Sequence, residues 1–150
     1  MKIGGVQVTA SEETLVLPRE GGDIVIKAQA YRIGDEFDKR CPLPTPPMVT
    51  TKDGPAPDFS DKHYKAAITV RDERRFAYLV LKSIEPSDIE WETVDIDKPA
   101  TWDKWGDELM DAGLTEVEVN RIVNAVLAAN SLDEEKIKQA RERFLRGQGA

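Results

Sequence analysis

The chain has 150 residues and a net charge of −7, with 40% hydrophobic and 33% charged residues, which describes one polar globular domain of common size. Its acidic balance argues against a general nucleic-acid binder, because contacts to phosphates need a basic surface. The longest unbroken apolar run, residues 76–81, is too short to span a bilayer, and we expect no secretory signal near Met1.

Residues 1–34 are predicted to form a small antiparallel β unit. An apolar run at residues 15–17 ends at Pro18, and a turn at residues 20–23 follows it. The segment 24–31 then has apolar residues at every second position, which is typical of a half-buried strand. A few strands need another layer to be stable, so this unit is expected to pack on an element later in the chain.

Residues 35–59 are predicted to be a proline-rich connector. Proline removes a backbone N–H donor and fixes φ, so a tract rich in proline can form neither a helix nor a central strand. We expect an extended spacer that is in part polyproline II. Six of the nine prolines lie in this tract: Pro42, Pro44, Pro46, Pro47, Pro55 and Pro57.

A long basic helix is predicted from Ser60 to about Ser83, the first of about four helices in residues 60–146. Apolar residues recur with a period of two in the first part of the chain and with a period near 3.6 after Ser60. Ser60 itself has the side chain of a helix N-cap. Pro86 is expected to enforce its end. Residues 62–83 of this helix include four more basic than acidic residues, so it is positively charged.

Three shorter helices are predicted after Pro99, which suits a first helical position. The first of them ends before Gly113. The second opens with the capping box Thr115-x-x-Glu118. The third opens at Ser131 or Asp133 and stops at Gly147, which leaves residues 147–150 as a frayed tail.

The chain is therefore predicted to be a single α+β domain over residues 1–150. It should have a small N-terminal antiparallel β unit, a proline-rich connector and a helical C-terminal half of about four helices. One shared helical core is expected from apolar residues at helical spacing: Trp102, Leu109, Ile122, Val126 and Phe144.

Residues 85–121 contain all three tryptophans and a steep acidic excess. Twelve carboxylates oppose three cations, so this acidic segment carries 3 − 12 = −9. Charge of this density beside large aromatics indicates a surface for a basic or amphipathic partner. A solvated acidic surface above a tryptophan core, or packing on the preceding basic helix, stays open as an alternative. The candidate partner-binding residues are Trp91, Trp102, Trp105, Asp103, Asp107, Asp111 and Glu116.

Residue types that carry catalysis are sparse. His63 is the only histidine, and its pairing with the only cysteine, Cys41, is weak grounds for a dyad or a zinc site. A single cysteine cannot form an internal disulfide, which suits a reducing cytoplasm. The carboxylates Asp95 and Asp97 do not have the spacing of a calcium loop. We therefore expect no enzymatic activity, no cofactor and no bound metal.

A series of short motifs runs through residues 24–146, and none of them is a catalytic signature. They are D-E-F-D-K-R-C-P-x-P-x-P-P at 35–47, I-E-W-E-T-V at 89–94, P-x-T-W at 99–102, E-L-x-x-A-G-L-T at 108–115, E-x-N-R-I at 118–122, Asn130 with Ser131 and Leu132, and A-R-x-x-F-L at 140–145. Together they resemble the tail assembly chaperones of long-tailed, siphovirus-type bacteriophages and prophages.

The resemblance implies an interaction protein that acts in the cytoplasm of the bacterial host. Such a chaperone binds the tape measure protein, keeps it soluble, helps recruit tail tube subunits during tail morphogenesis, and is absent from the mature virion. Many members also occur in a longer, frameshifted form, and this chain would correspond to the short one. Neither nucleic acid nor membrane is an expected partner, and formation of a homo-oligomer stays open.

Two other functions remain as alternatives. The acidic segment would suit a decoy that occupies and inhibits a nucleic-acid-binding protein, although the basic helix at residues 60–83 interrupts the negative charge that a decoy needs. A structural component of the tail would differ from a chaperone by persisting in purified virions.

Overall fold

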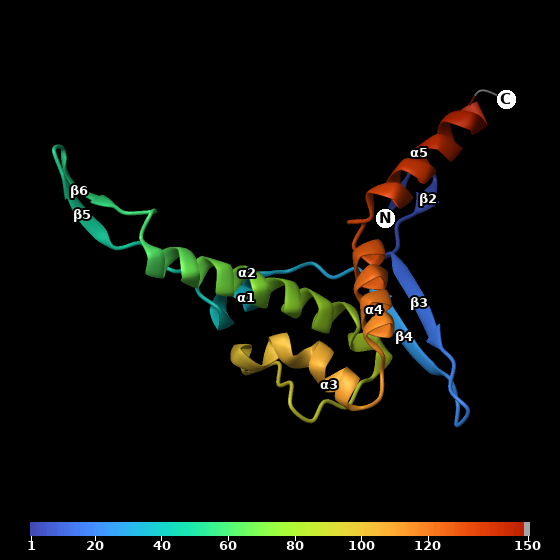
Figure 1. The fold of residues 1–150 in the computed structure, drawn as a ribbon. Coiled ribbons are helices and arrows are strands. Elements are labelled where there is room, and N and C mark those ends of the chain that lie inside the picture. The colour runs from blue at the N-terminus through green and yellow to red at the C-terminus, as the bar shows by residue number, and fades with distance from the viewer. Residues whose placement is uncertain (149–150) are drawn as a thin grey trace. The chain divides into compact units, whose positions relative to one another are not determined.

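The computed structural model describes residues 1–148 and has the predicted α+β fold (Figure 1). Antiparallel hairpins lie in the N-terminal half of the chain, and α2 to α5 follow in the helical C-terminal half. The elements are β1 (Lys2–Ile3), β2 (Val6–Gln7), β3 (Glu12–Leu17), β4 (Ile24–Gln29), α1 (Asp35–Arg40), β5 (Met48–Thr51), β6 (Gly54–Pro57), α2 (Lys62–Ser83), η1 (Glu85–Ser87), η2 (Pro99–Lys104), α3 (Trp105–Asp111), α4 (Glu116–Ala129) and α5 (Glu134–Gln148).

The chain divides into two compact units, and each is built from segments that are distant in the sequence. Unit 1 contains Met1–Arg32, Val80–Glu90 and the chain from Leu109 onward, whereas unit 2 contains Ile33–Leu79 and Trp91–Glu108. The expectation of a single domain stays a prediction.

Unit 1 is organised around the β3–β4 hairpin and α4. The two strands pair antiparallel from Glu12↔Gln29 to Leu17↔Ile24, and α4 packs against both of them. Leu17, Ile26 and Ala28 project from the covered face and are buried, because side chains alternate between the two faces of a strand. This packing confirms that a later helix supplies the second layer of the β unit.

A partly buried polar bridge connects three parts of unit 1 through Asn130. Its Oδ1 accepts a hydrogen bond from the backbone N–H of Tyr31 at 2.9 Å. Its Nδ2 donates to the Ser83 hydroxyl at 2.9 Å and to the Val126 carbonyl oxygen at 2.8 Å. Ser83 is fully buried, so Asn130 supplies the partner that its hydroxyl needs. Asn130, one of the motif residues, therefore has a structural role.

Glu118 joins the first turn of α4 to the β3–β4 turn. The predicted capping box is present, since the Thr115 hydroxyl accepts from the Glu118 N–H and the Glu118 carboxylate accepts from the Thr115 N–H. The same carboxylate accepts two hydrogen bonds from the Arg19 guanidinium, at 2.6 and 2.9 Å. The Arg19 hydrogen bonds, followed by the Thr115 N–H, lower the pKa of Glu118 to about 2.

The lowered pKa of Glu118 predicts a loss of stability in acid. A carboxyl whose pKa falls from 4.5 to about 2 on folding stabilises the folded state above pH 4.5, and this stabilisation is lost as pH falls towards 2. In the Glu118→Gln variant the side chain can still cap but carries no charge. Thermal melts between about pH 5 and pH 2 should therefore show a shallower fall of Tm in the variant. Parallel Tm curves for the two proteins would contradict this assignment.

Unit 2 has an aromatic core made by Phe37, Tyr78 and Trp102. The ring centroids lie 4.8 Å apart for Tyr78 and Trp102, and 5.6 and 6.1 Å from Phe37 to these two rings. All three side chains are buried, and the Trp102 Nε1–H donates to the Ile96 carbonyl oxygen at 3.2 Å. Buried aromatics with a satisfied polar group provide much of a small core.

Arg71 connects α2 to the D-E-F-D-K-R-C motif in unit 2. Its guanidinium donates to Asp38 at 2.7 Å and to the Cys41 carbonyl oxygen at 3.0 Å. It also lies over the Phe37 ring, 4.9 Å from the centroid. Arg40 of the same motif pairs with Asp97 at 2.9 Å. The motif therefore anchors α1 to the rest of unit 2.

The predicted connector at residues 35–59 contains more regular structure than expected. The helix α1 opens this stretch, and the β5–β6 hairpin occupies its second half. Proline excludes a central strand, but the hairpin has only two strands, so both are edges where a missing N–H can point outward. Regular structure is absent only from residues 41–47 and short links within this described stretch.

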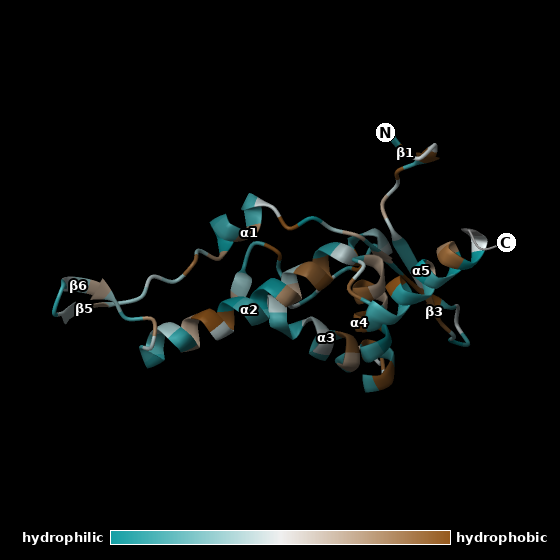
Figure 2. Cartoon of the chain, turned by 90° about the horizontal axis from the view of Figure 1, so that it is seen from above, coloured by the Kyte–Doolittle hydropathy of each residue, from teal (hydrophilic) through white to brown (hydrophobic). Residues whose placement is uncertain are grey.

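Three expectations for the helices were wrong. The cap of α2 is Asp61, whose Oδ2 accepts from the Tyr64 N–H at 2.9 Å, because Ser60 instead donates to Asp58. Phe144 is 63% exposed on α5, a largely hydrophilic helix with scattered apolar residues (Figure 2), and so it does not belong to the core. α5 also continues through Gly147 to Gln148, while residues 149–150 of the predicted tail lie outside the described residues.

The predicted shared core is divided between the two units. Ile122 and Val126 are fully buried in unit 1, whereas Trp102 is fully buried in unit 2. Helical periodicity identified which side of each helix is apolar, but it holds no information on which other element covers that side.

Candidate partner-binding site

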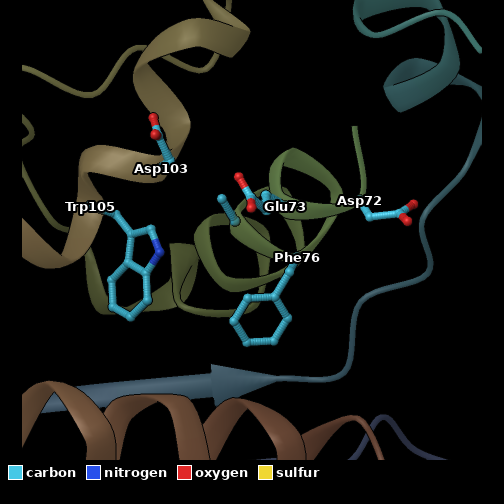
Figure 3. A pocket seen from close by; sticks show the side chains of 6 residues that line it. Asp72, Glu73, Phe76, Asp103 and Trp105 are labelled. Atoms are coloured by element: carbon cyan, nitrogen blue, oxygen red, sulfur yellow. The ribbon is translucent and has the colours of Figure 1, made fainter. Parts of the chain in front are cut away.

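An acidic and aromatic hollow of about 510 Å³ lies in unit 2. We call it the acidic hollow. Figure 3 shows Glu73 and Phe76 of α2 on one side and Asp103 and Trp105 on the other, with Asp72 directed away from Trp105. Its lining residues are Asp72, Glu73, Phe76, Ala77, Asp103 and Trp105.

One side of the hollow is formed by residues of α2 that lie on the same face of the helix. Residues three and four apart lie on the same face of an α-helix, so Glu73, Phe76 and Ala77 share one surface. Ala77 is small and buried, which leaves room between the larger side chains. Phe76 is 41% exposed and presents an aromatic ring to the opening.

The other side of the hollow is held by the turn from η2 into α3. Pro99 starts η2, and the Thr101 hydroxyl accepts from the Asp95 N–H at 2.9 Å, which fixes the preceding loop. Trp102 points into the core, so Asp103 and Trp105 are presented on the hollow. Trp105 is mostly buried and forms part of the wall.

This arrangement suits a cationic group. Aromatic rings attract Lys and Arg side chains through their π faces, and carboxylates add charge-assisted hydrogen bonds. Among residues 1–148, Glu73 and Asp103 take part in no salt bridge, so neither carboxylate is neutralised by a cation of the chain. The chemistry of the acidic hollow therefore suits a lysine or arginine side chain.

The structure brings together only some of the predicted site residues. Asp103 and Trp105 line the acidic hollow. Asp107, which follows Trp105 by two residues on α3, is exposed. Trp102 is buried and is unavailable for direct contact, while Trp91 is half-buried. Asp111 and Glu116 are exposed too, and they belong to unit 1.

Sequence reasoning missed the α2 side of the hollow. Asp72 and Glu73 are the two acidic residues of an otherwise basic helix, and Phe76 follows at helical spacing. That local interruption of the basic pattern beside an aromatic was the available signal.

Some carboxylates of the acidic segment have structural roles. Glu108 accepts hydrogen bonds from the N–H groups of Glu92, Thr93 and Val94, at 2.5, 2.7 and 3.2 Å. Burial raises the pKa of Glu108, but the three N–H donors outweigh burial, and the net result is a lowered pKa. The I-E-W-E-T-V and E-L-x-x-A-G-L-T motifs thus meet at this carboxylate. Glu108 therefore holds the loop at residues 92–94 and is not a free carboxylate of the acidic segment.

The two residues considered for catalysis differ in their access to solvent. Cys41 is buried and His63 is exposed on the first turn of α2. In the described part of the chain, no three His, Cys, Asp or Glu side chains are grouped so that they could hold a metal ion. The helices of residues 1–148 are also too short or too polar to cross a membrane.

No protein-family model, curated protein or solved structure matches the chain.

Proposed function

We propose that this protein is a phage tail assembly chaperone that binds the tape measure protein. It keeps that protein soluble in the host cytoplasm, helps recruit tail tube subunits, and leaves before the virion is complete. The observation that carries the proposal is the acidic hollow, with free carboxylates around exposed aromatic surface. Such a site suits the basic residues of a long amphipathic helix.

The positions of the motif residues support the proposal. Phe37 and Trp102 form the core of unit 2, Glu108 holds the neighbouring loop, and Asn130 bridges three segments of unit 1. Residues from separate motifs thus have cooperating structural roles.

The charge around the hollow suggests how binding would proceed. The exposed carboxylates of Asp103 and Asp107 would attract a basic partner and raise the association rate. One lysine or arginine would then enter the acidic hollow beside Phe76 and Trp105. Binding through exposed charges is weakened by salt and is readily reversible, which suits a carrier that must release its partner.

We expect charge reversal at the hollow to weaken binding of the tape measure protein. The Glu73→Lys/Asp103→Lys variant should raise the Kd by about tenfold or more, because it replaces attraction by repulsion at the point of contact. The matched control is Glu134→Lys/Glu135→Lys, which changes the net charge equally on exposed α5 and should alter the Kd by less than about twofold. Both are measured by biolayer interferometry at several salt concentrations.

Further measurements separate the chaperone from the other functions. Co-expression should raise the soluble yield of the tape measure protein, and mass spectrometry should find the chaperone missing from purified virions. Stoichiometric amounts in virions would instead identify a structural tail component. Failure to bind the tape measure protein at any salt concentration would eliminate the chaperone function.

A further inference from the structure

The β5–β6 hairpin extends beyond the N-terminal end of α2 in unit 2 (Figure 1). A ring contact between Phe59 and Tyr64, with centroids 5.9 Å apart, connects the end of the hairpin to the helix. Every residue of the two strands is exposed or half-exposed. A hairpin of two strands has little stability alone in water, so pairing with another strand would stabilise it.

The register determines which backbone groups of the hairpin point outward. Val49 pairs with Ala56, and Met48 pairs with Pro57. The Asp58 N–H donates to the Pro47 carbonyl oxygen at 2.7 Å, so Pro47 and Asp58 face each other across the ladder. Backbone groups alternate in direction along a strand, so those of Val49 face β6, whereas those of Met48 face outward.

The two outer edges of the hairpin differ in their ability to pair. Pro55 and Pro57 stand opposite Thr50 and Met48, at positions where an N–H would point outward. Proline has no N–H, so the outer edge of β6 lacks the donors that a further strand needs. The outer edge of β5 keeps the N–H and C=O groups of Met48 and Thr50. Figure 2 shows a pale hairpin with a hydrophilic tip, and β5 itself contains no charged residue.

We propose that β5 pairs antiparallel with β5 of a second copy of this chain, with the two-fold axis at Val49. Met48 of each copy then exchanges backbone hydrogen bonds with Thr50 of the other. The side chains of the two Val49 residues lie next to each other, and the absence of charge on β5 means that no like charges meet.

The blocked edge of β6 favours a second copy as the occupant. Copies of an unprotected hairpin could pair β5 with β6 repeatedly and build an open-ended fibre. Pro55 and Pro57 prevent that contact, so among antiparallel pairings of two such hairpins the one that keeps its donors is the closed, isologous dimer with strand order β6–β5–β5–β6. The fold thus permits one edge to pair and limits the assembly to two copies.

Sedimentation equilibrium of the full chain tests the proposal without the tape measure protein, so its outcome is independent of the proposed function. The wild-type protein should be a concentration-dependent dimer. Thr50→Pro removes one outward N–H per copy and leaves the β5–β6 ladder intact. It should raise the dimer Kd by about tenfold or more, because two inter-copy hydrogen bonds are lost. Circular dichroism should be unchanged.

A second variant should act in the opposite direction. Pro55→Thr/Pro57→Thr restores the outward donors of β6, so pairing of β5 with β6 of the next copy becomes available and light scattering should detect larger assemblies. A wild-type protein that is monomeric at every concentration, or a dimer that Thr50→Pro leaves equally stable, would overturn the proposal.

Discussion

Replacing Trp102 with alanine should lower the free energy of unfolding by about 3–5 kcal/mol. The side chain is fully buried and contacts the rings of Phe37 and Tyr78, so its removal leaves a large cavity in unit 2. The Ile96 carbonyl oxygen also loses its hydrogen bond from the indole N–H. Urea denaturation followed by circular dichroism measures the change.

Trp91→Ala is the matched control for the Trp102→Ala substitution. Trp91 is half-buried, so the same side chain is removed from a site that already contacts water. Its cost should be less than about half that of Trp102→Ala, because the transfer and cavity contributions both scale with burial. Equal costs for the two variants would mean that Trp102 is not the centre of the unit 2 core.

Replacing Ile122 with alanine should cost about 2–5 kcal/mol in unit 1. Ile122 is fully buried on the face of α4 that packs against β3 and β4, and its shortened side chain would leave part of that interface empty. The same urea titration measures this change. If the free energy of unfolding falls with urea concentration at the same slope as in the wild type, the surface area exposed on unfolding is the same in both proteins.

Phe144→Ala is the control that separates burial from hydrophobicity. Sequence periodicity placed Phe144 in the same core as Ile122, but its side chain is 63% exposed on α5. The substitution should therefore change stability by less than about 0.5 kcal/mol. A cost similar to that of Ile122→Ala would show that α5 packs its apolar side against another surface in solution.

The two variants concern different units, so together they examine how the chain unfolds. Trp102 lies in unit 2 and Ile122 in unit 1. If unfolding is cooperative over the whole chain, each variant shifts one common transition. If it is not, each should shift a separate transition, and unfolding followed by more than one probe would then give curves that do not coincide.

Features that depend on neighbouring residues could be predicted from the sequence. The capping box of Thr115 and Glu118 formed as expected, because both of its hydrogen bonds lie within one helical turn. The alternating residues of β4 bury Ile26 and Ala28 on one face for the same reason, since side-chain direction reverses at each residue of a strand. Local geometry is sufficient in both cases.

Features that depend on distant residues were found only in the tertiary structure. The Asn130 side chain bonds to Tyr31 and Ser83, which are 99 and 47 residues away in the sequence, and no local pattern predicts either partner. The candidate site shows the same division. Asp103 and Trp105 stood out by composition, but their combination with Glu73 required α2 and the η2–α3 turn to meet.

Composition, charge and periodicity were enough to determine the α+β class, the helical half and the acidic segment. Each of these features depends only on the residues within one continuous stretch of the chain. Burial is different, since it depends on what covers a side chain. Trp102 and Phe144 both sit in amphipathic helical segments, yet one is fully buried and the other is largely exposed. Only the tertiary structure decided between them, because the covering residues, Phe37 and Tyr78 for Trp102, come from remote parts of the chain.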